Sequence, residues 1–192
     1  MHITMTRTRR FCVLAAGLVP LMASSQLRDV DGRPAPLFTP SGAANVLIFV
    51  SSDCPISNGY APEIQRVCGA YGSKGVRCSL VYEDQRIDAA TVRKHLGEYR
   101  YAGMPAVVDA DRTVARRAGA SVTPQAVVVD GTGKVRYRGR IDNFYAAFGQ
   151  PRQRATVHDL RDALDAVIAG RTVATPETEA LGCFITSVKE AP

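Results

Sequence analysis

Apolar residues in this chain gather in short continuous runs, and these runs alternate with segments in which apolar positions recur at helical spacing. The runs predict buried strands at 46–50, 76–82, 106–108, 125–129 and 134–140. The helical pattern predicts helices at 55–71, 88–99, 113–118 and 158–169. Strands that alternate with helices, and end in a hairpin and a last helix, predict an α/β fold built as a three-layer sandwich.

Local signals refine several of these boundaries. Residues 27–31 and 36–38 are expected to pair as a short hairpin around Asp31-Gly32. Pro62 removes a helix hydrogen bond, so the helix at 55–71 should bend or restart near Gly59 and Pro62. Asp88 is expected to cap the next helix, and the turn at 130–133 closes the second hairpin.

The N-terminal segment has the pattern of a secretory signal peptide. Arg7, Arg9 and Arg10 precede an apolar run at 11–22, and the small residues Ala23 and Ser25 suit cleavage. The run is short for a membrane span, although an uncleaved anchor is the alternative. We therefore expect a signal peptide at 1–25, one domain at 26–170 and a tail at 171–192, in a protein that is periplasmic or otherwise exported.

Length and charge narrow the functional class. Removing residues 1–25 from the 192-residue chain leaves 167 residues, a common size for one domain. This segment carries three arginines and no acidic residue, so the net charge of the mature chain falls from +6 to +3. The remaining basic residues are interleaved with acidic ones, as on an ordinary solvated surface, and we expect no nucleic-acid partner.

Cys54 is the strongest chemical candidate because it lies where the first predicted strand ends and a helix begins. A thiol at a helix N-terminus faces unpaired backbone N–H groups and the positive end of the helix dipole, which favour the nucleophilic thiolate. The alternative is a small buried filler, a common role of free cysteine. Asp53 either opposes the thiolate by its charge or caps the helix through the Ile56 amide.

Three more cysteines follow in the mature chain. Cys68 lies roughly 21 Å along the same helical segment from Cys54, too far for a disulfide unless the helix bends. Cys68 and Cys78 are expected inside the core, either as a structural bridge or as two buried thiols. No CxxC pair and no Cys/His cluster at zinc spacing is present in the sequence, and His95 and His158 are expected at the surface or as caps, so we expect neither a metal nor a cofactor.

Two motifs resemble those of the thioredoxin superfamily. Cys54-Pro55-Ile56-Ser57 has the spacing of its redox motif with serine in place of the second cysteine, and Thr123-Pro124 resembles its threonine before a cis-proline. Closer still, 53–58, 60–63 and Gly182-Cys183 resemble a group of exported bacterial redoxin-domain proteins similar to alkyl hydroperoxide reductase and thiol-specific antioxidant. The resemblance covers about 28–170 and implies a thioredoxin-like α/β/α sandwich with a central mixed sheet.

The same resemblance implies the residues of the site. Cys54 would be the nucleophile, while Thr123, Pro124, Pro55 and Ser57 would line the substrate site. A cis bond at Pro124 costs little and would present the backbone of Thr123 to an extended partner.

Ser57 cannot resolve a mixed disulfide, so a second thiol is needed. Cys183 is the candidate by exclusion, because the thirteen residues after Gly170 could span about 40 Å when extended. A free tail thiol, or one that pairs with a second molecule, is the alternative.

Three functions remain open. The first is disulfide exchange with protein or small-molecule disulfides and thiols, completed by Cys183 or an external thiol reductant. The second is peroxide reduction through a sulfenic acid on Cys54. The third is a binding module, with copper delivery disfavoured because Asn58 replaces the second cysteine of a CxxxC pair.

Peroxiredoxins resemble this chain but differ from it in the motif around the nucleophile. Leu47 replaces their proline, Ser51 fills their threonine position, and Pro124 occupies the place of their activating arginine. Arg138 or Arg140 could substitute only if the hairpin directs one of them toward Cys54. These differences favour disulfide exchange.

Overall fold

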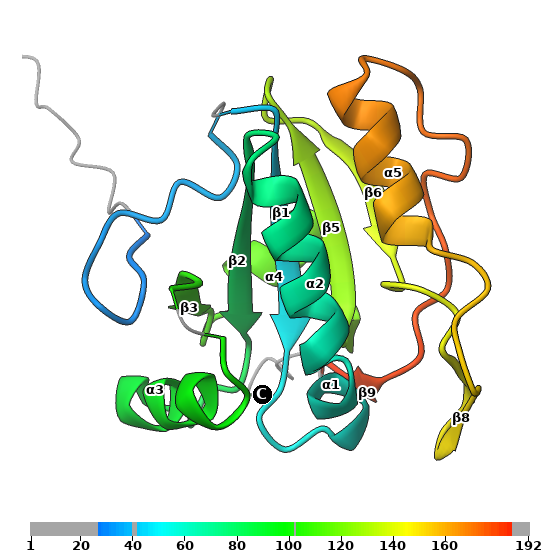
Figure 1. Ribbon diagram of the computed structural model, residues 1–192. Coiled ribbons are helices and arrows are strands. Elements are labelled where there is room, and N and C mark those ends of the chain that lie inside the picture. The colour runs from blue at the N-terminus through cyan, green and yellow to red at the C-terminus, as the bar shows by residue number, and fades with distance from the viewer. Residues whose placement is uncertain (1–26, 40–41, 102, 186–192) are drawn as a thin grey trace, which may run out of the picture.

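The computed structural model describes residues 27–39, 42–101 and 103–185. A five-stranded sheet forms its centre, with strand order β3-β2-β1-β5-β6 (Figure 1). The strands are β1 (Ala44–Val50), β2 (Val76–Tyr82), β3 (Ala106–Val108), β5 (Gln125–Asp130) and β6 (Val135–Gly139). The β1–β2 and β2–β3 pairs are parallel, whereas β1–β5 and β5–β6 are antiparallel, so the expected mixed sheet is confirmed.

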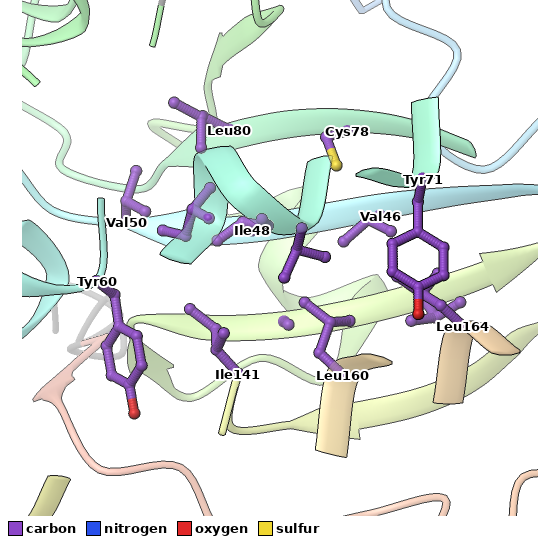
Figure 2. Packing of buried hydrophobic residues seen from close by; sticks show 14 of the residues in the cluster. Val46, Ile48, Val50, Tyr60, Tyr71, Cys78, Leu80, Ile141, Leu160 and Leu164 are labelled. Carbon is purple, nitrogen blue, oxygen red and sulfur yellow. The ribbon is translucent and has the colours of Figure 1, made fainter. Parts of the chain in front are cut away.

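Helices cover both faces of this sheet. On one face, α2 (Ala61–Gly72) and α5 (Asp159–Ile168) pack their apolar sides on alternate residues of β1, as Figure 2 shows for Val46, Ile48 and Leu160. On the other face, α4 (Thr113–Ala118) and the N-terminal segment pack against Leu47 and Phe49. β1 is buried along its whole length, because its side chains alternate between two apolar layers.

The predicted break in the first helical segment is present. It divides into α1 (Pro55–Gly59) and α2, with Tyr60 between them and Pro62 in the first turn of α2. At that position the missing proline N–H costs no helical hydrogen bond. Asp88 caps α3 (Ala89–Glu98) as predicted, since its carboxylate accepts from Thr91 N at 2.7 Å.

Short elements outside the central sheet were not all predicted. β4 (Val122–Thr123) pairs with β9 (Cys183–Phe184), and β7 (Tyr145–Ala147) pairs with β8 (Gln150–Pro151). The hairpin expected near the N-terminus is reduced to one antiparallel bridge between Arg28 and Pro34.

Cys68 and Cys78 form a disulfide, which settles the alternatives left by the sequence. The bond joins α2 to β2, and the two Cα atoms lie 5.9 Å apart. Cys78 faces the same side of β2 as Val76 and Leu80, as the strand pattern predicted, whereas Cys68 is only half-buried. The cross-link therefore fastens a covering helix to the sheet.

The two histidines lie in different surroundings, and the prediction for His95 is wrong. His95 is not at the surface: it is 4% exposed and packs among Tyr82, Tyr99 and Tyr101. His158 is exposed and is the N-cap residue of α5, as predicted, although its side chain makes no capping hydrogen bond.

The predicted signal peptide at 1–25 and the last residues of the tail lie outside the described residues. Within 27–39, 42–101 and 103–185, no helix combines the length and the apolar character needed to cross a membrane.

Candidate active site

Cys54 lies at the carboxyl end of β1, after the turn at 51–53, and is the N-cap residue of α1. It is only 1% exposed and carries a free thiol. Its Sγ donates a hydrogen bond to Thr123 O at 3.3 Å. The strand, the turn and the helix thus place the candidate nucleophile against the backbone of a segment 69 residues away.

The segment that receives this hydrogen bond contains the predicted cis-proline. The Thr123–Pro124 peptide bond is cis, and both residues are buried. Thr123 is the last residue of β4, so its carbonyl stands at the edge of a two-residue strand. The expectation of a cis bond is confirmed; whether Thr123 and Pro124 bind a substrate stays a prediction.

The tail brings Cys183 to the same place. β9 runs antiparallel to β4, with Cys183 opposite Thr123 and Phe184 opposite Val122. The Thr123 hydroxyl also donates to Cys183 O at 3.5 Å. The structure therefore brings together Cys54, Thr123 and Cys183, as the sequence analysis expected for a cysteine carried by the tail.

Cys183 packs against the core cluster that contains Cys54, and the two thiols influence each other electrostatically. Partial burial, a hydrogen bond to the Cys54 sulfur and the charge of a Cys54 thiolate together raise the pKa of Cys183 to about 11. The nearby carboxyl of Glu83 contributes in the same direction. This shift keeps Cys183 protonated at neutral pH.

Ser57 and Pro55 have different surroundings. Ser57 is buried, and its Oγ accepts a hydrogen bond from Ser51 N at 3.2 Å, so it supports the turn that carries Cys54. Pro55 is exposed at the first position of α1. The sequence predicted both as substrate-binding residues, and only Pro55 presents a free surface.

A buried hydrogen-bond chain, which sequence reasoning missed, holds the same turn. Asn58 donates from Nδ2 to Ser52 O at 2.8 Å, and its Oδ1 lies 2.9 Å from His95 Nε2. His95 Nδ1 in turn lies 2.8 Å from the Tyr82 hydroxyl. Since Asn58 Oδ1 can only accept, Nε2 of His95 carries the proton and Nδ1 accepts from Tyr82.

His95 remains neutral in this chain because burial lowers its pKa. The helical pattern of α3 gave no signal for this role, because His95 has charged and small neighbours in sequence. Only the tertiary placement of Tyr82 and Asn58 reveals it.

Charged side chains near the site already form ion pairs or hydrogen bonds with other residues. Arg138 pairs with Glu177 at 2.6 Å, and Arg140 pairs with Asp159 at 2.6 Å. Asp53 is exposed and accepts from the Ser52 hydroxyl at 3.3 Å, and no side chain caps the start of α1. Among the described residues, no group of three or more His, Cys, Asp or Glu side chains is arranged to hold a metal ion.

Glu83 is a further buried acid at this end of the sheet, directly after β2. Burial raises the pKa of its carboxyl group, and Oε2 makes no hydrogen bond. Its charge acts on Cys183, as described above.

Comparisons with solved structures support the fold. An uncharacterized conserved protein from Geobacillus kaustophilus superposes with a TM-score of 0.71 at 26% identity, covering 86% of this chain and 89% of its own. A hypothetical protein from Sinorhizobium meliloti 1021 gives a TM-score of 0.70 at 27% identity, covering 83% and 88%.

A more distant similarity carries information on the fold alone. A secreted Mycobacterium tuberculosis disulfide oxidoreductase, described as homologous to Escherichia coli DsbE, gives a TM-score of 0.52 at 19% identity, covering 76% of this chain and 94% of its own. No curated protein sequence matches the chain.

The sequence itself matches one protein family over more than half of its length. The profile of the AhpC/TSA family aligns with residues 21–138, which include Cys54, the turn before it and the cis-proline. Together with the thioredoxin-like sheet, this match identifies the chain as a redoxin-domain protein of the thioredoxin superfamily that belongs to the AhpC/TSA family.

Proposed function

We propose that this protein is an exported thiol–disulfide oxidoreductase in which Cys54 is the nucleophile and Cys183 the resolving cysteine. One observation carries the proposal: Cys183 lies opposite Thr123 in the β4–β9 pair, and the carbonyl of the same Thr123 accepts a hydrogen bond from the Cys54 thiol. The pairing of β9 with β4 therefore fixes the thiol of the tail at the site of the proposed nucleophile.

The reaction proceeds by two exchanges. The Cys54 thiolate attacks one sulfur of a partner disulfide, whose S–S bond breaks as the mixed disulfide forms and the second partner sulfur leaves as a thiolate. Cys183 then loses its proton and attacks the Cys54 sulfur, which releases the first partner thiol. The partner is reduced by two electrons, and the Cys54–Cys183 disulfide holds the oxidising equivalent until an external thiol reductant removes it.

The electrostatics of Cys183 suit this order of events. While Cys54 is a thiolate, its charge and its hydrogen bond keep the proton on Cys183. Formation of the mixed disulfide removes that charge, so the pKa of Cys183 falls and the resolving thiolate becomes easier to form.

Peroxide reduction is the less favoured alternative. Arg138 and Arg140, which could have replaced the missing activating arginine, are bound to Glu177 and Asp159. Export is supported by the N-terminal sequence pattern and by the Cys68–Cys78 disulfide, because structural disulfides persist in oxidising compartments.

The test is peptide mapping of the protein without reduction, after treatment with bis(2-hydroxyethyl) disulfide. A Cys54–Cys183 peptide should form, with two thiols released per protein. Cys183→Ser should stop at a mixed disulfide on Cys54, and Cys54→Ser should release no thiol. If Cys183 stays free while Cys54 is consumed, Cys183 is not the resolving cysteine. If hydrogen peroxide oxidises Cys54 much faster than the disulfide does, the protein is a peroxidase.

A further inference from the structure

The tail is fastened to the domain at two separate places. The first place is β6: Arg138 N donates to Pro176 O at 2.9 Å, and Thr178 N donates to Arg138 O at 3.1 Å. The Thr178 hydroxyl also accepts from Arg140 N at 3.1 Å. These contacts hold 176–178 as an anchor next to the central sheet.

The second place is β4, where the tip of the tail docks. Beyond the pairing of Cys183 with Thr123, Ile185 N donates to Ser121 O at 2.9 Å. Gly182 lies so close to β4 that a Cβ built on it would stand 2.1 Å from Thr123 O. The tip therefore fits this edge only because the residue before Cys183 has no side chain.

The docked tip covers the nucleophile. Cys54 is 1% exposed, its Sγ donates to Thr123 O, and Cys183 of the tip pairs with the same Thr123. Phe184, the next residue of the tip, is 80% exposed. A polypeptide carrying a disulfide cannot bring its sulfur to Cys54 while Cys183 occupies this position.

From these contacts we propose that the tip, residues 182–185, is an internal substitute for a polypeptide substrate. This proposal rests on the function proposed above. In the reduced protein the tip occupies the edge of β4, so exchange with a polypeptide disulfide begins when β9 leaves. The segment that replaces β9 pairs with β4 in the same antiparallel register, with its cysteine opposite Thr123.

This register defines the chemical class of the partner. The residue before the partner's reactive cysteine lies against Thr123 O, where only glycine fits. The residue one further back stands where Leu181 lines a cavity of about 220 Å³. Tyr60, Tyr145 and Pro124 offer apolar contacts there, and Arg140, Asp142 and Glu179 also line the cavity. The residue after the cysteine takes the solvent-facing place of Phe184 and is not selected.

The first experiment measures access to Cys54 in a Cys183→Ser background, which removes the competing thiol. Alkylation of Cys54 by a polyethylene-glycol maleimide is followed by peptide mass spectrometry. Adding Gly182→Ala should raise the rate by about tenfold or more, a change that loss of one or two backbone hydrogen bonds would give. Gly69→Ala is the matched control, since a Cβ at that exposed helical position meets no atom within 4 Å.

A second variant guards against misfolding. Truncation after Ala180 removes Leu181 together with the tip, introduces no clash and should give the same increase, with thermal unfolding confirming that the domain is intact. If both variants label at the rate of the Cys183→Ser parent, the tip does not cover Cys54 and the inference is wrong.

The second experiment tests the partner class on the truncated protein. Two disulfide-linked peptides, Leu-Gly-Cys-Phe and Leu-Ala-Cys-Phe, are compared, and the glycine peptide should exchange with Cys54 at least about tenfold faster. Equal rates would overturn the register. These failures differ from failure of the proposed function, in which the full-length protein forms no Cys54–Cys183 disulfide at all.

Discussion

Two pairs of cysteines lie at opposite ends of the same sheet, and only one pair is bonded. Cys78 is near the start of β2 and opposite Val46 of β1, and it is joined to Cys68 of the covering helix. Cys54 follows the end of β1 and meets Cys183 without a bond. In parallel strands the reactive edge is the carboxyl end, where turns and helix N-termini converge. Position on the sheet therefore separates the Cys68–Cys78 disulfide from the pair of thiols that we propose to be reactive.

The pairs also differ in how they are assembled. Cys68 and Cys78 are ten residues apart, on two elements that pack on each other. Cys54 and Cys183 are brought together by a two-residue strand pair and by the hydrogen bonds of the turn. The first arrangement is held by a covalent bond, whereas the second is held only by noncovalent contacts, which the proposed function requires to open.

The largest expected effect is the loss of stability when the Cys68–Cys78 disulfide is removed. Cys68→Ala combined with Cys78→Ala should lower the free energy of unfolding by ~2–4 kcal/mol, because the unfolded chain regains the freedom that the cross-link removed. The rate of Cys54 exchange with a small disulfide should stay within twofold of the parent. Urea unfolding and exchange kinetics measure the two quantities, and a loss of exchange in a folded variant would contradict the separation of roles.

A smaller effect is expected from the turn that positions Cys54. Asn58→Ala leaves the buried His95 Nε2–H without its acceptor, which should cost ~1–3 kcal/mol of stability. It also frees Ser52 O, so we expect a several-fold slower exchange at Cys54. Lys94→Ala is the control on α3, the helix that carries His95, because the contact of Lys94 with Glu98 is exposed and 3.7 Å long. Equal behaviour of the two variants would show that the chain through Asn58 does not position the thiol.

The smallest expected effect concerns the pKa of Cys183, which forms no disulfide with Cys54. Cys54→Ala removes the hydrogen bond and the charge that help to raise the pKa of Cys183, so this pKa should fall below about 11. Each unit of decrease gives about tenfold more Cys183 thiolate at neutral pH. The midpoint of Cys183 alkylation against pH measures the shift, and an unchanged midpoint would mean that burial and Glu83, not Cys54, raise the pKa.

The sequence predicted the central sheet and its covering helices because long apolar runs and helical spacing are local signals. The position of Cys54, the cap at Asp88 and the restart at Pro62 follow from the same local chemistry. The cis bond at Pro124 came only from the resemblance to a known superfamily.

Other features depend on distant partners and leave little trace in sequence. β4 and β9 are two residues each and are joined across 60 residues, so neither has a periodic pattern of its own. His95 is buried because Tyr82 and Asn58 satisfy both ring nitrogens, and nothing near it in sequence indicates this. The bond between Cys68 and Cys78 stayed open because spacing alone cannot separate a bridge from two buried thiols.

The anchor at 176–178 shortens the free length of chain that carries Cys183 and so affects how fast this thiol can react at Cys54. Measured from the last helix, Cys183 is carried by a long connection, but Thr178 is held on β6 only five residues before it. For a thiol on so short a tether, the effective concentration near its target reaches the millimolar range. After the tip leaves, Cys183 therefore competes as a local reagent against any thiol in solution, and the lifetime of a mixed disulfide at Cys54 is set by five residues of chain.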